Sequence, residues 1–145
     1  MHKVFTLLLL VVLATTPFVG RACSCVDVSI RKGYKQSDII FAGTLIGKAQ
    51  AERLTRYTFR VNHLYKGTLR ADTVSVFSSG RGEDCGSNFA LNSSYLIYSW
   101  FRDAKPKSIF DSGPKVSPYL YTSLCSRNKP DRFANLYEKA VLTFL

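Results

Sequence analysis

The sequence predicts a mainly β domain, a closed barrel with helices packed against its outside. Five or six short apolar or alternating segments follow one another at the spacing of strands in a small barrel. The clearest helical pattern lies at the C-terminal end. All four cysteines lie between residues 23 and 125, in the part of the chain that also contains these segments. An even number of cysteines is typical of secreted domains that supplement their core with disulfides.

The first 22 residues have the pattern of a secretory signal peptide. Residues 4–14 form an almost unbroken apolar stretch of about 11 residues, whereas a bilayer-spanning helix needs roughly 20. Gly20 and Ala22 supply the small residues that signal peptidase prefers, so we expect cleavage after Ala22. Lipid attachment at Cys23 is the alternative, but Gly20 stands where that signal requires an aliphatic residue.

Cleavage would leave residues 23–145 as one secreted domain, extracellular or, in a bacterium, periplasmic. Lys3 and Arg21 would leave with the signal peptide, so the 20 basic and 10 acidic residues become 18 and 10, a net charge of +8. Such a charge suits an acidic protein, a sulfated polysaccharide or a membrane face. Because the chain has no dense basic run, we interpret the charge mainly as a solubilising surface. No later segment predicts a transmembrane anchor.

The first predicted elements after the cleavage site are a weak helix and a strand. Residues 26–37 have apolar side chains at helical spacing, although Gly33 weakens the pattern. Residues 38–46 form an apolar β run. Gly43 within that run predicts a bulge or a bend of the barrel.

The second and third strands are predicted by alternation and by β-branched residues. Residues 73–77 form the third strand, and a glycine-rich loop over residues 78–86 contains Cys85. Lys66-Gly67 ends the second strand, residues 56–65. In that second strand one apolar face contains Tyr57, Phe59, Val61, His63 and Tyr65.

The remaining strands follow after this loop. Residues 95–101 are apolar except for Ser99, as expected of a strand buried on both sides. Residues 102–117 predict a long loop with a short strand near Ser108–Phe110. Residues 119–124 form a last short strand before Cys125.

The C-terminal segment predicts an amphipathic helix. Asn128 or Lys129, before Pro130, is the expected start, because proline is tolerated in a first helical turn. An apolar stripe at spacings of three and four residues predicts the face packed on the barrel. The stripe contains Phe133, Leu136, Tyr137, Ala140, Val141 and Phe144.

The cysteines predict two disulfides. Four cysteines allow three connectivities, and a Cys23–Cys25 bond would close a strained ring. Cys23 and Cys25 should therefore reach out to Cys85 and Cys125, with both pairings still open. A zinc site built from all four is the alternative, but the chain lacks a Cys-x-x-Cys pair.

Catalytic motifs are scarce. His63 is the one histidine after the cleavage site, and on an apolar strand face it predicts a packed side chain rather than a base. Gly80-Arg81-Gly82 lacks the Lys-Ser/Thr of a phosphate-binding loop. Glu83 and Asp84 beside it are interpreted as solvated loop carboxylates. We therefore expect no enzyme, no catalytic residue and no cofactor.

The unusual feature is Cys23-Ser24-Cys25 at the predicted mature N-terminus. A free α-amine has a pKa near about 8 and is a fair metal ligand. With the carbonyl of the same residue it can form a five-membered chelate. Because catalytic zinc keeps one position open for water, such a chelate could displace that water.

Several segments together resemble the N-terminal domain of the tissue inhibitors of metalloproteinases, within the netrin-like module family. The resemblance covers nearly the whole mature chain, and Cys-x-Cys at a mature N-terminus is its most specific part. The matching segments are Cys23–Cys25, Asp38–Thr44, Tyr57–Val61, Leu64–Gly67, Cys85–Gly86 and Thr122–Cys125.

The resemblance implies an OB-fold, a five-stranded Greek-key barrel with flanking helices, and the disulfides Cys23–Cys85 and Cys25–Cys125. It implies that Cys23 chelates the target's zinc through its amine and carbonyl and that Ser24 enters the S1′ pocket of the protease. Cys25 also contacts the protease. The loop residues Gly82, Glu83 and Asp84 form a second contact.

This chain lacks the third disulfide and the separate C-terminal domain of the animal inhibitors, and it is closer to short, single-domain bacterial-type members. We therefore expect a secreted inhibitor of zinc metalloproteinases that holds no metal when free and binds no nucleic acid. The alternative is a non-inhibitory module whose basic barrel surface binds an anionic polysaccharide or a protein.

Overall fold

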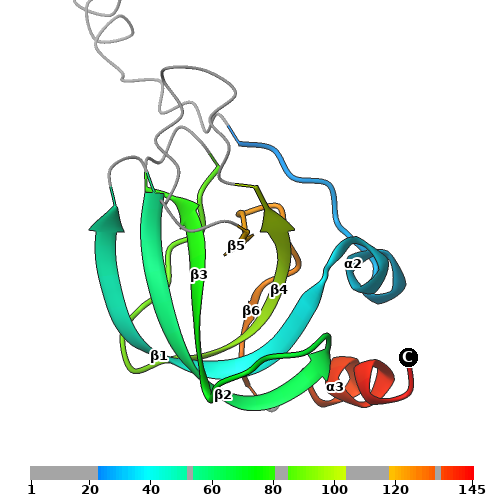
Figure 1. The fold of residues 1–145 in the computed structure, drawn as a ribbon. Coiled ribbons are helices and arrows are strands. Elements are labelled where there is room, and N and C mark those ends of the chain that lie inside the picture. The colour runs from blue at the N-terminus through cyan, green and yellow to red at the C-terminus, as the bar shows by residue number, and fades with distance from the viewer. Residues whose placement is uncertain (1–22, 52–53, 81–84, 104–117, 133–134) are drawn as a thin grey trace, which may run out of the picture.

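The computed structural model describes residues 23–51, 54–80, 85–103, 118–132 and 135–145. The predicted signal peptide, and the short strand expected near residues 108–110, lie outside these residues. Within the described part of the chain the secondary structure is mainly β, as predicted (Figure 1). Its elements are α2 (Ile30–Gln36), β1 (Ile39–Ala51), β2 (Leu54–Lys66), β3 (Thr73–Ser79), β4 (Ser94–Arg102), β5 (Tyr119–Tyr121), β6 (Lys129–Pro130) and α3 (Leu136–Thr143).

Five of the strands close on themselves. The sheet runs in the order β1-β2-β3-β5-β4, and β1 also pairs with β4, which completes the circle. The β3–β5 pair is parallel and the other pairs are antiparallel. The short β6 pairs with the beginning of β4, at Tyr95 and Leu96. The closed sheet confirms the barrel predicted from the sequence.

The long strand β1 closes the barrel because it bends. Its first six residues pair with β4, while the whole strand pairs with β2 through three register shifts. One shift falls between Ala42 and Gly43, where a Cβ atom on Gly43 would lie 2.7 Å from the Arg60 carbonyl oxygen. Only glycine permits that approach, so the predicted bend at Gly43 is confirmed.

Aromatic and aliphatic side chains fill the barrel interior. The rings of Phe41 and Phe59 pack edge to face with centroids 5.6 Å apart, and Phe89 packs against Phe59 at the same distance. Edge-to-face packing suits the quadrupoles of these rings. The buried interior cluster comprises Ile39, Phe41, Leu45, Tyr57, Phe59, Val76, Phe89, Ile97 and Leu120.

A second, smaller core lies outside the barrel, beneath the two helices. Leu96 and Tyr98 of β4 are fully buried there, while Ile97 between them faces the interior. Strand β4 is therefore buried on both sides, as its continuous apolar run predicts. Ile40 and Leu142 complete the buried part of this outer core.

The helix α2 is held at both ends by side chains. Ser29 caps its first turn, where the Ser29 hydroxyl accepts a hydrogen bond from the Lys32 amide. At the other end the Lys66 ammonium donates to the carbonyls of Tyr34 and Ser37, at 2.6 Å each. A cation at a helix C-terminus also favours the helix dipole. These contacts confirm a helix within the weak pattern of residues 26–37.

The expected burial of His63 is wrong. The side chain is exposed, and its ring lies 4.5 Å from the ring of Tyr65. The reason is an extra residue in β2: Val61 pairs with Gly43 and His63 with Ala42, which leaves Asn62 unpaired in the register. Alternation shifts by one residue at that bulge, so His63 faces solvent.

The predicted start and packing face of the C-terminal helix are also wrong. Lys129–Pro130 forms β6, and α3 begins at Leu136. Glu138 and Leu142 face the barrel, whereas much of the predicted apolar stripe is exposed. Glu138 is buried because Arg127 and Tyr98 of the barrel offer it partners. The stripe residue Phe133 lies outside the described residues.

Candidate functional site

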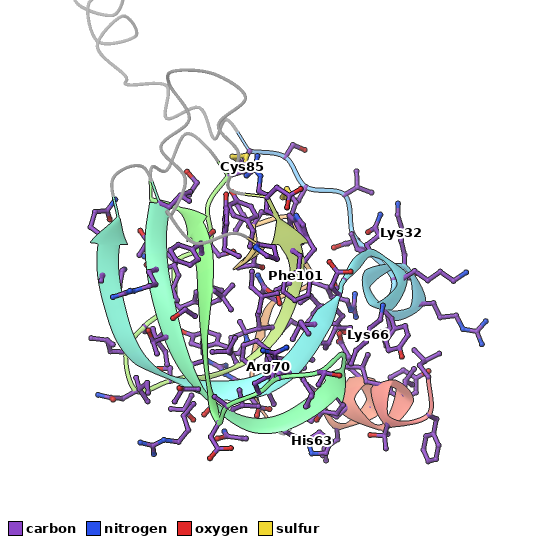
Figure 2. All side chains as sticks on the ribbon, in the orientation of Figure 1. Lys32, His63, Lys66, Arg70, Cys85 and Phe101 are labelled. Atoms are coloured by element: carbon purple, nitrogen blue, oxygen red, sulfur yellow. A yellow bond between two sulfur atoms is a disulfide. The ribbon has the colours of Figure 1, made fainter. Side chains whose placement is uncertain are left out.

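Two disulfides fix the start of the predicted mature chain to the barrel. Cys23 is bonded to Cys85 and Cys25 to Cys125, with Cα–Cα distances of 5.6 Å and 5.1 Å. These are the pairings that the family resemblance implies, and they rule out a zinc site formed by all four thiolates. Figure 2 places Cys85 at the end of the barrel that the N-terminal segment reaches.

The segment that begins at Cys23 is half-buried at Cys23 and exposed from Ser24 to Asp27. Ser24 and Cys25 are exposed, and Val26 after them is 83% exposed. Residues 23–29 have no regular secondary structure and run along the outside of the barrel to α2 (Figure 1). The segment can therefore be contacted by a large partner. The second predicted contact, residues 82–84, lies outside the described residues.

The backbone around Cys85 packs closely against neighbouring segments of the barrel. Cys85 has a left-handed backbone conformation, φ 53°. The next residue, Gly86, lies so close to β3 that a Cβ atom would come within 1.9 Å of the Ser79 carbonyl oxygen. The Leu124 amide donates to the Cys85 carbonyl at 2.8 Å. This bond joins the two disulfide-bearing loops directly, because Leu124 precedes Cys125.

Asn128 fixes the turn that carries Cys125. Its side-chain amide donates to the Thr122 hydroxyl at 2.7 Å and to the Ser123 carbonyl at 3.2 Å. Its side-chain oxygen accepts from the Tyr98 amide of β4 at 2.9 Å. One side chain thus ties the turn to the barrel wall. Sequence reasoning considered Asn128 only as a possible start of the C-terminal helix, since its partners on other segments leave no local signal.

Arg127 connects the N-terminal segment to α3. Its guanidinium donates to the Val28 carbonyl and to both carboxylate oxygens of Glu138, at 2.6 and 3.0 Å for the latter. Tyr98 donates to the same carboxylate at 2.6 Å, and Lys129 lies 3.2 Å from it. Sequence reasoning missed this network too. The one available signal was a charged residue within an otherwise apolar helical pattern.

The electrostatics of this network favour ionised Glu138. Burial alone would raise the pKa of Glu138, but its hydrogen bonds with Arg127 and Tyr98 outweigh burial, and the pKa is lowered. The pKa of Arg127 is raised, chiefly by its bond to Glu138. Burial, followed by the bond to Glu138, raises the pKa of Tyr98. At neutral pH the network therefore joins an ionised Glu138 to a charged Arg127.

A cavity lies between the N-terminal segment, α2 and the barrel wall. Its volume is about 400 Å³, and Val28, Tyr98, Cys125 and Arg127 are among its lining residues. The N-terminal segment is therefore separated from the barrel wall by this cavity near Val28. Its position depends on the disulfides and on the Arg127 bond rather than on apolar packing.

Neither metal ligands nor a membrane span are found in the part of the chain that the structure describes. No group of three or more His, Cys, Asp or Glu side chains gathers there. None of its helices is long and apolar enough to cross a bilayer.

Comparisons with known proteins add no family assignment. Neither the protein-family models nor the curated proteins match this chain. The functional interpretation therefore depends on the geometry of the N-terminal segment and on the sequence resemblance described above.

Proposed function

We propose that the protein is a secreted, non-enzymatic inhibitor that chelates the catalytic zinc of a metalloproteinase through Cys23. The observation that carries the proposal is the tripeptide Cys23-Ser24-Cys25, which is half-buried at Cys23, exposed at Ser24 and Cys25, and fixed at both cysteines by disulfides. After cleavage behind Ala22, its first residue would offer a free α-amine beside its own carbonyl. The Cys23 sulfur is used in the disulfide and is not the ligand.

The chemistry follows from these two groups. An amine nitrogen and a carbonyl oxygen on one residue close a five-membered ring with a metal ion. A catalytic zinc with three protein ligands keeps one position for water and accepts a fifth ligand, so the chelate can replace that water. Because both cysteines are already held, little conformational freedom is lost on binding. Ser24, between them, is the side chain that would enter the neighbouring S1′ pocket.

The rest of the molecule supports the proposal less specifically. The strand order and the parallel β3–β5 pair support the OB-fold that the resemblance implies. Two disulfides fit an oxidising, extracellular or periplasmic compartment. These features supply a rigid base for the tripeptide, and the inhibitory function itself is proposed from the tripeptide alone.

The test is inhibition of a panel of zinc metalloproteinases by two oxidised, refolded proteins. One begins at Cys23, and the matched control carries a single alanine before Cys23. The extension leaves both disulfides in place but moves the free amine away from the chelating carbonyl. We expect strong inhibition by the first protein and none by the second, with identical near-ultraviolet circular dichroism.

Two outcomes would contradict the proposal. Equal inhibition by both proteins would show that the α-amine of Cys23 is not a ligand. No inhibition of any panel member by either protein would favour the alternative, a binding module with a structural Cys-x-Cys. Salt-sensitive binding to a heparin-like polymer, unchanged by the added alanine, would then support that alternative.

A further inference from the structure

The outer face of α3 is apolar. Leu136, Tyr137 and Ala140 share one side of the helix, and Phe144 follows as the residue that caps its C-terminus. Leu136 is 49% exposed, Tyr137 76% and Phe144 89%. The buried side of the same helix carries Glu138 and Leu142. Much of the apolar stripe of α3 is therefore exposed to solvent. Soluble proteins rarely expose large apolar patches, and those that they do expose mark interaction sites.

The outer face of α2 is basic. Arg31, Lys32 and Lys35 are all exposed, while Gly33 packs against Tyr98. Figure 2 shows Lys32 on the side of α2 that faces away from the barrel. None of the ion pairs between described residues involves these three cations. Two exposed carboxylates flank the helix in the sequence, Asp27 before it and Asp38 after it.

The two helices form one layer on the barrel. Both pack on the outer core: Ile30 and Tyr34 of α2 and Leu142 of α3 contact the same buried cluster around Tyr98. The helices also contact each other, and they lie on the same side of the barrel (Figure 1). Their outward faces therefore adjoin, and together we call them the basic–apolar face. Its residues are Arg31, Lys32, Lys35, Leu136, Tyr137, Ala140 and Phe144.

We propose that the basic–apolar face binds membranes that contain anionic phospholipids. A suitable partner must present negative charge beside an apolar layer, and the headgroups and acyl chains of such a bilayer do both. Aromatic side chains such as Tyr137 and Phe144 are typical of that boundary, with lysine and arginine toward the headgroups. A second copy of the chain fits less well, because pairing the apolar stripes would bring two sets of three cations together.

This inference is independent of the proposed inhibition. The N-terminal segment reaches one end of the barrel, and α3 lies near the opposite end (Figure 1). Membrane binding through the helices would leave Ser24 and its neighbours accessible to a partner. The protein would then act at a cell surface rather than free in solution.

The test is co-sedimentation of the oxidised protein that begins at Cys23 with phosphatidylcholine vesicles containing about 30% phosphatidylserine. We expect binding to these vesicles at about 0.1 M salt, weaker binding at about 0.5 M salt, and little binding to pure phosphatidylcholine. Because each basic residue contributes a factor of about five, the triple variant Arg31→Gln/Lys32→Gln/Lys35→Gln should bind about 100-fold more weakly. Tyr137→Ser/Phe144→Ser should also lose most of the binding.

The matched control removes three exposed cations from another part of the surface. Arg56→Gln/Arg60→Gln/Arg70→Gln has the same net charge as the α2 variant, and its positions lie on β2 and the loop after it. Far-ultraviolet circular dichroism checks that every variant is folded. We expect the control to change binding by less than about fivefold.

Three results would overturn the proposal. Equal losses in the control and the α2 variant would show that net charge alone drives binding. Binding that survives Tyr137→Ser/Phe144→Ser would exclude insertion of the apolar stripe. Absence of vesicle binding by the unmodified protein would leave the face to another occupant, such as an acidic protein.

Discussion

Ser24 is the residue on which specificity should depend. It is exposed between two cysteines whose disulfides fix them to separate loops of the barrel. A side chain in that setting can be exchanged without disturbing the core, since neither Ser24 nor its neighbours pack in the barrel interior. The two residues therefore have different proposed roles: Cys23 supplies the zinc ligands, and Ser24 supplies the contact with the neighbouring pocket.

Ser24→Leu should change selectivity while leaving stability unchanged. A larger apolar side chain in the S1′ pocket should shift the inhibition constant of at least one panel protease by about tenfold, which corresponds to about 1.4 kcal/mol. The free energy of unfolding, measured in urea, should change by less than about 0.5 kcal/mol because the position is exposed. Inhibition constants that all shift by one common factor would argue against a pocket contact.

The proposed chelate also predicts a pH dependence. Only a neutral α-amine binds zinc, and its ordinary pKa is about 8. Below that pH the inhibition constant should therefore rise by up to about tenfold for each pH unit, measured on a target that stays active. A small zinc-binding inhibitor without an amine serves as the control for the target's own titration. Constant inhibition from about pH 8 to about pH 5.5 would contradict the chelate.

At the scale of elements, the Arg127–Glu138 pair joins three segments that are distant in the sequence. Arg127 follows the turn that carries Cys125, Glu138 belongs to α3, and the Val28 carbonyl belongs to the N-terminal segment. Helix α3 therefore supports the proposed site indirectly, through one guanidinium. The pair is largely buried, with side chains 20% and 5% exposed.

Glu138→Gln should destabilise the protein by roughly 3 kcal/mol at neutral pH, because it leaves a partly buried guanidinium without its carboxylate. The pKa of Glu138 is lowered from its ordinary value of 4.5, so its contribution to stability is present above that pH. The contribution is lost as the pH falls through the lower, folded-state pKa.

Urea unfolding at two pH values tests this linkage. The difference in unfolding free energy between the unmodified protein and Glu138→Gln should narrow between pH 7 and about pH 3. The exposed carboxylate Asp27 belongs to none of the ion pairs between described residues, so Asp27→Asn is the control. A difference that does not change with pH would show that Glu138 acts through packing alone.

The strands could be predicted from the sequence, whereas the packing of α3 could not. Alternation and β-branched residues are local signals, and they located β2 to β5 within three residues at each end, whereas β1 runs on to Ala51, beyond its predicted end at Ile46. The buried face of α3 depends on Arg127 and Tyr98, which no local pattern links to Glu138. His63 was misplaced for a similar reason, since the bulge at Asn62 arises from pairing with the bent strand β1. Bulges and buried ion pairs are properties of the tertiary structure.

The candidate site was predictable to a different degree. The Cys-x-Cys pattern located the segment, and the resemblance supplied both disulfide pairings, which the structure contains. The supporting bonds of Asn128 and Arg127 were not predictable, because their partners lie on other strands and on α3. The predicted contacts at residues 82–84 remain a prediction.

At the scale of the whole molecule, the disulfides tie the closed barrel to the predicted mature N-terminus. The two bonds span sequence separations of 62 and 100 residues, and both hold the same short segment. Long loops of this kind strongly restrict the unfolded chain. Stability and the geometry of the site therefore depend on the same two bonds.

Cys25→Ser/Cys125→Ser should lower the free energy of unfolding by roughly 4 to 5 kcal/mol, because it opens the longer loop. The same variant should lose inhibition even under conditions where circular dichroism shows a folded barrel. Urea denaturation measures the first effect, and the protease panel the second. Full inhibition by the folded double variant would show that a second anchor at Cys25 is not needed.

The most direct test of the proposed zinc chelation is spectroscopic. The zinc of the most strongly inhibited protease is replaced by Co²⁺, and its visible absorption is recorded with the protein that begins at Cys23 and with the alanine-extended control. We predict that the first protein shifts and weakens the cobalt bands as the metal gains a fifth ligand, and that the control leaves them unchanged. Tight binding of the Cys23 protein with an unaltered cobalt spectrum would contradict the chelate.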